Sequence, residues 1–221
     1  MREPGAKSDP TPTRRRPVIA GRQGRDRPGT PPRTVRPRRM TMTDFRVPNP
    51  YDALPDLPAL EVTSESFDEW ASLSPAQLGG KMGVEGGEDK SPQVSWSAGP
   101  EGTRTYVVTV FDPDAPTASG FWHWSVANIP ADVTSLPEGA CTGEDTSGLP
   151  EGAVVVRNDA GFKGFVGAAP PEGHGPHRYI LAVHAVGDRI DLGEDASCAF
   201  VGFNLFGQGL ARGTTTAVFE Q

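Results

Sequence analysis

The chain has 221 residues, two cysteines and a formal net charge of −7 at pH 7. This length suits one domain with an added tail, and such a domain buries a sizeable core without disulfides. Two cysteines exclude a disulfide framework and a zinc site built on paired cysteines, while one bond between Cys141 and Cys198 stays open. No apolar run reaches the length of a membrane helix and no apolar stretch follows the basic start, so we expect a cytoplasmic protein.

The first 42 residues are rich in arginine, proline and glycine, and they hold 12 basic and 3 acidic residues. Such a segment cannot bury enough surface to offset its chain entropy, so we predict a disordered basic tail over residues 1–42 and one domain over residues 43–221. Two interpretations of the tail stay open: a basic arm for nucleic acid or acidic lipid, or a misassigned start, with the true start at Met40 or Met42. The rest of the chain has 9 basic and 25 acidic residues and is expected to repel nucleic acid.

Removal of the tail tests its role. A chain that begins at Met42 is expected to melt at the same temperature as the full chain and to bind the same ligand equally well, because the tail offers no apolar face for docking. Thermal unfolding and ligand titration of both chains measure this. A clear loss on truncation would make the tail part of the working protein. Salt-dependent binding of nucleic acid by the full chain alone would favour the basic arm.

From Leu60 onward the pattern is mostly that of strands separated by turns rich in Gly, Pro and Asp. A short helical turn is expected to begin at Ser74-Pro75, with the serine as its cap. Strands are predicted, in chain order, over Arg104–Phe111, Phe121–Ile129, Ala153–Asn158, His177–Val186 and Thr214–Phe219. The first of them carries apolar residues on both alternating faces, which is typical of a central buried strand.

One longer helix is expected near the C-terminus, from about Asp195 to Arg212, with Asp195 or Ser197 as its cap. An apolar stripe at helical spacing predicts it and consists of Ala199, Phe203, Phe206 and Leu210. Three glycines in the segment weaken the helix. Runs of strands with few helices predict a mainly β fold of the sandwich type.

The segment DPDAP, Asp112 to Pro116, directly follows the predicted strand that ends at Phe111. Its two prolines restrict the backbone, so Asp112 and Asp114 are held by stiff chain. One interpretation is a turn that ends a strand, since Asp and Pro both favour turns. The other is a site in which the carboxylates serve acid–base chemistry, a metal ion or a ligand.

Two further segments carry histidines. In FWHWSV, alternation along a strand places His123 on the face opposite Trp122 and Trp124, where it is either a core residue or the wall of a pocket. The loop GAAPPEGHGPHRY, dense in glycine and proline, delivers His177 and Tyr179 to one face of the following strand, with the arginine between them pointing away. Loops at strand ends are frequent positions of binding sites.

These segments resemble, in order and spacing, the phosphatidylethanolamine-binding protein family, the family of the Raf kinase inhibitor protein, and most of all its bacterial Raf-kinase-inhibitor-like branch. The resemblance rests on SPQVSW, DPDAP, WHW with NIP, and GAAPPEGHGPHRY, and it covers the chain from about Leu60 to the end. It implies a large antiparallel sheet packed on a smaller one, with a few short helices. It also implies a small anion-binding pocket at one end of the sheets.

The matching positions give the ligand-binding residues that the resemblance implies. In the pocket these are Asp112, Asp114, His123, His177 and Tyr179, with Pro116 and Pro171 at its rim and Trp96 beside it. The family often holds phosphate, acetate, cacodylate or the phosphatidylethanolamine head group there. We expect neither a cofactor nor a metal ion.

The chemistry of these residue types suits such a pocket. Imidazole and phenol groups donate hydrogen bonds to an anion, and a carboxylate beside an imidazole fixes its tautomer, favours its charged form, or receives the ammonium of phosphoethanolamine. If imidazolium groups hold the anion, binding weakens as the pH rises through about 6.5. His177→Ala is then expected to abolish binding and to leave the fold intact, because a rim position carries little core packing.

We therefore expect a protein that binds a small anion or a phosphorylated group and is not an enzyme. The family resemblance adds a regulatory role, inhibition of a kinase or a protease. The alternative is a hydrolase or metal-dependent enzyme that uses the Asp and His residues, but the sequence contains neither a nucleophile elbow nor an HExxH motif. A homodimer stays open.

Overall fold

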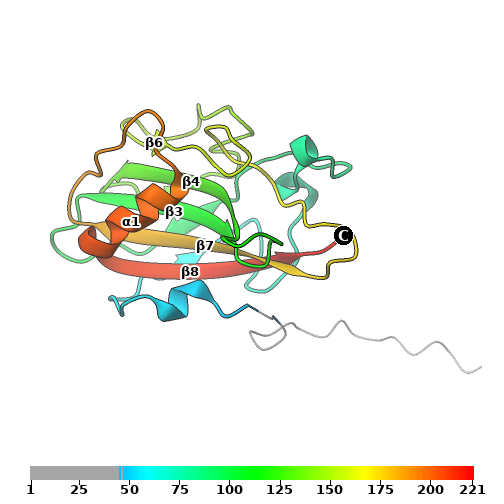
Figure 1. Ribbon diagram of the computed structural model, residues 1–221. Helices are drawn as coiled ribbons and strands as arrows, with labels where there is room; N and C mark the ends of the chain where they lie inside the picture. The colour runs from blue at the N-terminus through cyan, green and yellow to red at the C-terminus, as the bar shows by residue number, and fades with distance from the viewer. Residues whose placement is uncertain (1–44, 46) are drawn as a thin grey trace, which may run out of the picture. The chain divides into compact units, whose positions relative to one another are not determined.

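The computed structural model describes residue 45 and residues 47–221, so the predicted tail over residues 1–42 lies outside the described residues. The described chain forms two antiparallel sheets with few helices (Figure 1). The strand order is β6-β4-β3-β7-β8 in the larger sheet and β1-β2-β5 in the smaller one. The predicted fold class, a mainly β fold with a large and a small antiparallel sheet, is confirmed.

The strands of the larger sheet are β3 (Thr105–Asp112), β4 (Phe121–Pro130), β6 (Val154–Val155), β7 (His177–Val186) and β8 (Gly209–Phe219). Those of the smaller sheet are β1 (Val62–Thr63), β2 (Val94–Trp96) and β5 (Ser135–Leu136). The helices are the 3-10 helices η2 (Pro50–Ala53), η3 (Pro75–Gln77) and η4 (Gly80–Met82), and the α-helix α1 (Cys198–Gln208).

The larger sheet is covered on both faces, as the apolar pattern of its central strands predicts. On one face, β3, β4 and β7 contribute buried side chains to a core that includes Val94 and Leu136 of the smaller sheet. On the other face, Val107 of β3 and Val186 of β7 belong to a second cluster with Val201 of α1. Helix α1 lies across this second face (Figure 1).

Helix α1 is shorter than predicted and turns a different side to the sheet. Ser197 caps its start, because its Oγ accepts the N–H of Phe200, while β8 begins directly at Gly209. The stripe that predicted the helix does not pack on the sheet: Phe203 and Phe206 are 76% and 79% exposed, whereas Cys198 and Val201 are buried. The helix packs through its smaller side chains.

Three other local predictions differ from the structure. Strand β8 begins at Gly209 and not at Thr214, and β6 covers only Val154–Val155 of the predicted strand. The helical turn at Ser74-Pro75 is the 3-10 helix η3, and the Ser74 hydroxyl donates to Oε1 of Gln77 at 2.7 Å without capping a backbone N–H. The two cysteines are both buried and both free thiols.

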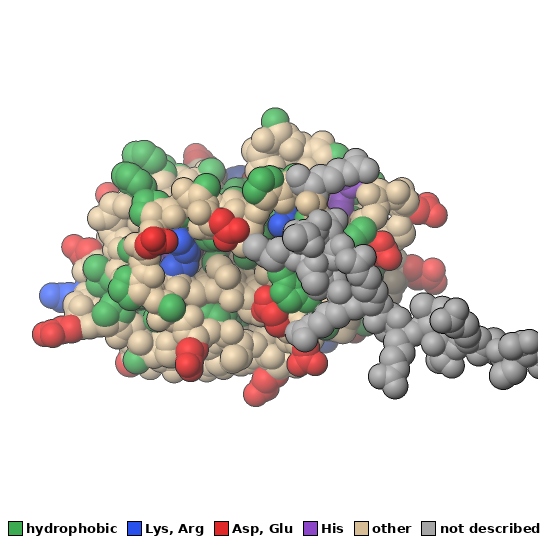
Figure 2. Space-filling model, turned by 90° about the horizontal axis from the view of Figure 1, so that it is seen from below, with side chains coloured by type: hydrophobic (Ala, Val, Ile, Leu, Met, Phe, Trp, Pro, Cys, Tyr) green, Lys and Arg blue, Asp and Glu red, His purple; other side chains and the backbone are tan. Residues whose placement is uncertain are grey.

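On the face seen in Figure 2, acidic side chains are scattered over the surface and outnumber the basic ones. This agrees with the excess of acidic residues that the sequence shows beyond residue 42. Within residues 45 and 47–221, no helix has the length and apolar character needed to cross a membrane.

Candidate functional site

A cavity of about 140 Å³, here called the Asp112 cavity, lies at one end of the larger sheet. Asp112 ends β3, His123 lies near the start of β4, and His177 begins β7. Antiparallel pairing of these three strands places that end beside those starts, so residues far apart in the sequence meet. The lining contains six of the eight predicted site residues: Asp112, Pro116, His123, Pro171, His177 and Tyr179.

Asp112 is buried, and both of its carboxylate oxygens have partners within the protein. Oδ1 accepts the backbone N–H groups of Asp114 and Ala115, at 2.8 and 3.0 Å, and thereby fixes the DPDAP turn. Oδ2 lies 2.7 Å from Nδ1 of His177, which donates its proton to the carboxylate. Asp112 therefore orients His177 and holds the turn, and it has little capacity left for a ligand.

His177 is buried, so the expectation that it occupies a rim position with little packing is wrong. Its other ring nitrogen, Nε2, lies 2.7 Å from Nδ1 of His174, and the His174 side chain is exposed. Asp112, His177 and His174 thus form a hydrogen-bonded chain from a buried carboxylate to the surface. The hydrogen bond between the two imidazoles thus connects the buried His177 to a solvent-exposed side chain.

His123 lies in a β-bulge of β4, and the bulge changes the predicted pattern of side chains. Val110 of β3 pairs with Trp124 and the next residue, Phe111, pairs with Trp122, so His123 is the extra residue. His123 and Trp124 both point toward the core beneath the smaller sheet, whereas Trp122 lies against Phe111 on the other face. The prediction that His123 faces away from both tryptophans is therefore wrong for Trp124, because alternation is interrupted at a bulge.

Burial lowers the pKa of His123, against smaller opposing effects of the Asp112 carboxylate and the Val166 carbonyl. The ring is therefore neutral at ordinary pH. Nδ1 donates to the carbonyl oxygen of Val166 at 2.8 Å, which leaves Nε2 as an acceptor. Nε2 of His123 is therefore available as a hydrogen-bond acceptor, and the neutral ring is not the charged donor that an imidazolium-based site requires.

The hydroxyl of Tyr179 is buried and has no hydrogen-bond partner among the described residues. Its ring meets the His123 ring edge-on, with 5.2 Å between the centroids. Burial raises the pKa of Tyr179, with further contributions from the carboxylates of Asp112 and Asp114, so the phenol stays protonated. An unsatisfied buried donor costs about 1 to 3 kcal/mol, which a ligand oxygen that accepts the proton would recover.

Asp114 does not line the cavity, although it follows Asp112 by two residues. Its carboxylate accepts Nε and Nη2 of Arg178, each at 2.8 Å, and also the backbone N–H of Arg178 at 2.9 Å. The buried guanidinium donates in addition to the carbonyl oxygen of Val47 at 2.7 Å, and its carbon lies 4.5 Å from the centre of the Phe45 ring. Asp114 thus attaches the DPDAP turn to β7, and its ligand-binding role stays a prediction.

Trp96 also lies away from the cavity, and the expectation that it stands beside the pocket is wrong. It belongs to β2, whose neighbours are β1 and β5 of the smaller sheet. Its buried ring packs edge-on against Tyr106, with 5.4 Å between the centroids. Trp96 therefore contributes to the core between the sheets.

Sequence reasoning missed two residues that shape the site, His174 and Arg178. The signal for His174 was present in GHGPH, where two histidines three residues apart flank a Gly-Pro turn. Arg178 points away from the face of His177 and Tyr179, as predicted, but its burial was not foreseen. Two carboxylates in a stiff DPDAP turn were a signal that a cation lies nearby.

Comparisons with known proteins agree with this architecture. A family model described as phosphatidylethanolamine-binding protein matches residues 63–220. UPF0098 protein YbcL of Escherichia coli (strain K12) is 45% identical over 163 residues, which is 73% of this chain and 88% of the relative. UPF0098 protein YbhB of the same organism is 48% identical over 140 residues, 63% of this chain and 86% of the relative.

Solved structures give the same assignment. The crystal structure of E. coli YbcL, described as a new member of the mammalian PEBP family, matches with a TM-score of 0.70 and 44% identity and covers 73% of this chain and 98% of that one. A PEBP homologue from Chlamydia trachomatis, CT736, matches with a TM-score of 0.59 and 25% identity, over 74% of this chain and 98% of that one. The chain therefore belongs to the phosphatidylethanolamine-binding protein family.

Proposed function

We propose that the Asp112 cavity binds a small anion or the phosphoryl part of a phosphoethanolamine-like head group, and that the chain is a binding protein and not an enzyme. Membership of the family supports a ligand-binding role of this type. The observation that carries the choice of ligand is the Tyr179 hydroxyl, a buried donor without an acceptor in the described part of the chain. It belongs to a cavity whose other polar groups include two imidazoles.

An anion in this cavity accepts the Tyr179 O–H and, when both ring nitrogens of His177 carry protons, the N–H at Nε2. Asp112 holds Nδ1 of His177, so the Nε2 side is the one that turns to a ligand. His174 now occupies that side, but it is exposed and lies between Gly173 and Gly175, both with a positive φ, at 72° and 93°. A ligand oxygen therefore displaces an exposed side chain on a Gly-rich loop, which costs less than moving a buried group.

The cavity also contains a hydrogen-bond acceptor, Nε2 of His123, which suits a ligand that carries an ammonium group or a protonated phosphate. Both carboxylates of DPDAP are already bonded within the protein, so the ammonium group is not assigned to them. Nε2 of His123 accepts from the ammonium group or from a phosphate O–H instead. Among residues 45 and 47–221, no lysine or arginine lines the cavity and acidic residues are in excess, so we expect weak affinity for free phosphate.

Phosphoethanolamine titration tests the proposal, followed by NMR of the side chains of the four histidines. We expect shifts at His123, His174 and His177 and not at His184, and we expect Tyr179→Phe to weaken binding about tenfold while the ring preserves the packing. Tyr51→Phe is the control, because Tyr51 is a half-buried tyrosine that lies outside the Asp112 cavity. Equal affinity of Tyr179→Phe and the wild type would contradict the proposal.

The alternative, a hydrolase or metal-dependent enzyme, has one observation in its favour. A histidine oriented by a buried carboxylate, as His177 is by Asp112, is the arrangement of a general base. The Thr117 hydroxyl in the lining donates to the carbonyl of Gly120, and in the described part of the chain no three His, Cys, Asp or Glu side chains are grouped as metal ligands. Turnover of a generic phosphoester or ester by the wild type, lost in His177→Ala, would replace the binding proposal.

We also propose a more specific function, a regulatory role in which the chain inhibits a kinase or a protease. It requires a protein partner that contacts the rim of the Asp112 cavity, where Pro171 is exposed. Phosphoethanolamine is then expected to change the inhibition of that partner, which an enzyme assay with and without the compound measures.

A further inference from the structure

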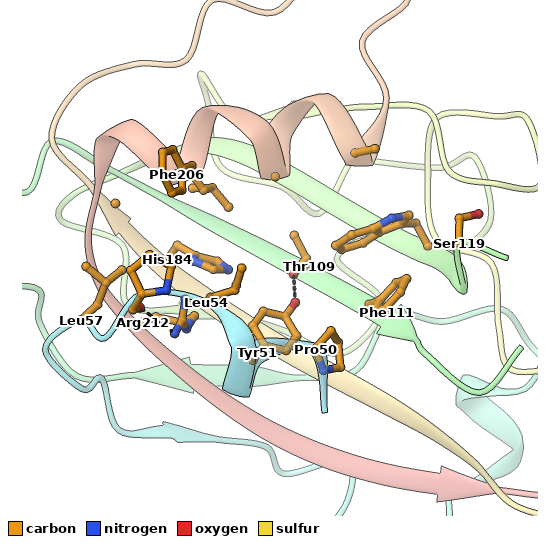
Figure 3. A pocket seen from close by; sticks show the side chains of 16 residues that line it. Pro50, Tyr51, Leu54, Leu57, Thr109, Phe111, Ser119, His184, Phe206 and Arg212 are labelled. Atoms are coloured by element: carbon orange, nitrogen blue, oxygen red, sulfur yellow. Dashed lines mark hydrogen bonds between the residues drawn. The ribbon is translucent and has the colours of Figure 1, made fainter. Parts of the chain in front are cut away.

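A second cavity, of about 370 Å³, lies on the other face of the larger sheet and is here called the α1 cavity. Figure 3 shows it between the sheet and α1, with the segment around η2 on its other side. It shares no lining residue with the Asp112 cavity. Phe111 and Trp122 line the α1 cavity, whereas their chain neighbours Asp112 and Phe121 line the other, so the sheet separates the two.

The walls of the α1 cavity are mostly apolar. The larger apolar side chains are Leu54, Leu57, Phe111, Trp122, Leu205 and Phe206. The volume lies in the range of small-molecule sites, which combine apolar walls with a few polar groups that fix the orientation of the ligand. Each methylene group that such walls remove from water strengthens the binding of an apolar chain.

The one guanidinium of the lining stands at one end of the cavity. Arg212 of β8 pairs directly with His184 of β7, so the two side chains are neighbours on one face of the sheet (Figure 3). Nη2 of Arg212 donates to the carbonyl oxygen of Pro55 at 3.2 Å, and the guanidinium carbon lies 5.8 Å from the centre of the Tyr51 ring. Among residues 45 and 47–221, Arg212 forms no ion pair with a carboxylate.

His184 adds a neutral hydrogen-bonding group to this end. Its ring is buried, and within residues 45 and 47–221 it makes no hydrogen bond. Burial and the charge of Arg212 lower the pKa of His184 to about 3, so the imidazole stays neutral and keeps one N–H donor. This end of the cavity therefore offers a single positive charge with a neutral donor beside it, a set that suits one anionic head group.

The opposite end of the cavity is aromatic and has no charge. Along β3, Val107 pairs with His184, and Phe111 lies four residues further, about 13 Å away at the rise of a strand. Figure 3 shows His184 and Arg212 at one side of the cavity and Phe111 with Ser119 at the other. The cavity is therefore elongated, with its charge at one end.

We propose that the α1 cavity binds a medium-chain fatty acid, with its carboxylate on Arg212 and His184 and its hydrocarbon chain under α1 toward Phe111. The guanidinium of Arg212, which has no carboxylate partner among the described residues, favours a ligand with an anionic head group. The elongated apolar part of the cavity favours a hydrocarbon chain over a compact anion. The extended chain of decanoate suits the distance from His184 to Phe111. This proposal does not depend on the function proposed for the Asp112 cavity.

Titration of decanoate into the full chain tests the head-group contact, with calorimetry for affinity and NMR for the histidine side chains. We expect a shift of His184 without shifts of the other three histidines, and about tenfold weaker binding of decanol, which has the same chain without the charge. Arg212→Gln is expected to weaken decanoate binding about tenfold as well. Arg189→Gln is the control, because Arg189 also donates from Nη2 to a single carbonyl, that of Gly152 at 3.0 Å, outside the cavity.

A second pair of variants tests the position of the chain. Gly202 of α1 lines the cavity, and a Cβ there meets nothing within 4 Å, so Gly202→Leu fills open space and improves the helix. Gly207→Leu makes the same change in the same helix outside the lining, also into open space. We expect Gly202→Leu alone to lose decanoate binding and both variants to keep phosphoethanolamine binding.

Three results would overturn the proposal. One is equal affinity for decanoate and decanol, and another is unchanged decanoate binding in both Gly202→Leu and Arg212→Gln. The third is a set of shifts confined to His123, His174 and His177, which would assign decanoate to the Asp112 cavity. Failure of phosphoethanolamine to bind would not affect this proposal, because different histidines line the two cavities and their NMR shifts report binding to each one separately.

Discussion

Replacing Asp114 with alanine is expected to lower the free energy of unfolding by about 3 to 5 kcal/mol, because it leaves a buried charge without its partner. The side chains of Arg178 and Asp114 are only 2% and 10% exposed, and three hydrogen bonds join Arg178 to the Asp114 carboxylate. After the substitution, the described partners left to the guanidinium are the Val47 carbonyl oxygen and the Phe45 ring. Urea denaturation of the wild type and the variant at pH 7 measures the difference.

The matched control is Glu144→Ala, which breaks a solvent-exposed ion pair instead of a buried one. Nζ of Lys81 lies 3.3 Å from the Glu144 carboxylate, and the two side chains are 46% and 65% exposed. Exposed pairs contribute about 0 to 1 kcal/mol, so this variant should unfold almost as the wild type does. Similar small losses in both variants would refute the structural role of Asp114, and weaker phosphoethanolamine binding at full stability would return Asp114 to the ligand-binding residues.

Acid is expected to destabilise the protein through His184. Burial and the neighbouring Arg212 lower the pKa of this residue from 6.5 in the unfolded chain to about 3 in the folded one. Between these values the unfolded state binds a proton that the folded state does not, so the stabilisation is complete above pH 6.5 and is lost as the pH falls toward 3. From pH 6.5 to pH 4 the loss due to His184 is about 3 kcal/mol.

The variant His184→Gln isolates this effect because it removes the titrating group. Denaturation of both proteins between pH 7 and pH 4 should give a shallower decline for the variant. His123, whose pKa burial also lowers, is present in both proteins, so its contribution cancels in the comparison. The groups that face His184 are Arg212 and Tyr51, and burial raises the pKa of Tyr51, away from this range. Parallel curves for the two proteins would rule out a buried, neutral His184.

The central strands were predictable because their sequence pattern is local. Strand β7 has the predicted bounds, His177–Val186, and β3 is displaced by one residue, since both are buried runs rich in β-branched residues. The members of the Asp112 cavity were predictable from motif resemblance, which brought together Asp112 and His177 across 65 positions. No periodic pattern contains that information.

The features that the sequence did not reveal depend on contacts across the fold. Helix α1 carries two apolar stripes, and the one with Cys198 and Val201 packs on the sheet although the phenylalanines are larger. Which stripe is buried depends on how closely the sheet surface approaches the helix, and composition does not report this. The bulge at His123 likewise depends on pairing with β3, and the burial of Arg178 depends on Asp114, 64 positions away.

The bulge also means that β4 does not need His123 in order to be a strand. Trp122 and Trp124 already lie on opposite faces and already pair with consecutive residues of β3, as they would in an uninterrupted ladder. A chain shortened by this one residue would keep both tryptophans in place and lose the imidazole. A second irregularity lies between Val126 and Ile129, and a loss of one residue in the regular ladder between the two, such as Ser125, would turn the side chains beyond it to the wrong faces. The cavity-lining histidine is thus an addition to a strand that is complete without it, so gain or loss of this side chain by a single-codon insertion or deletion is compatible with an unchanged fold.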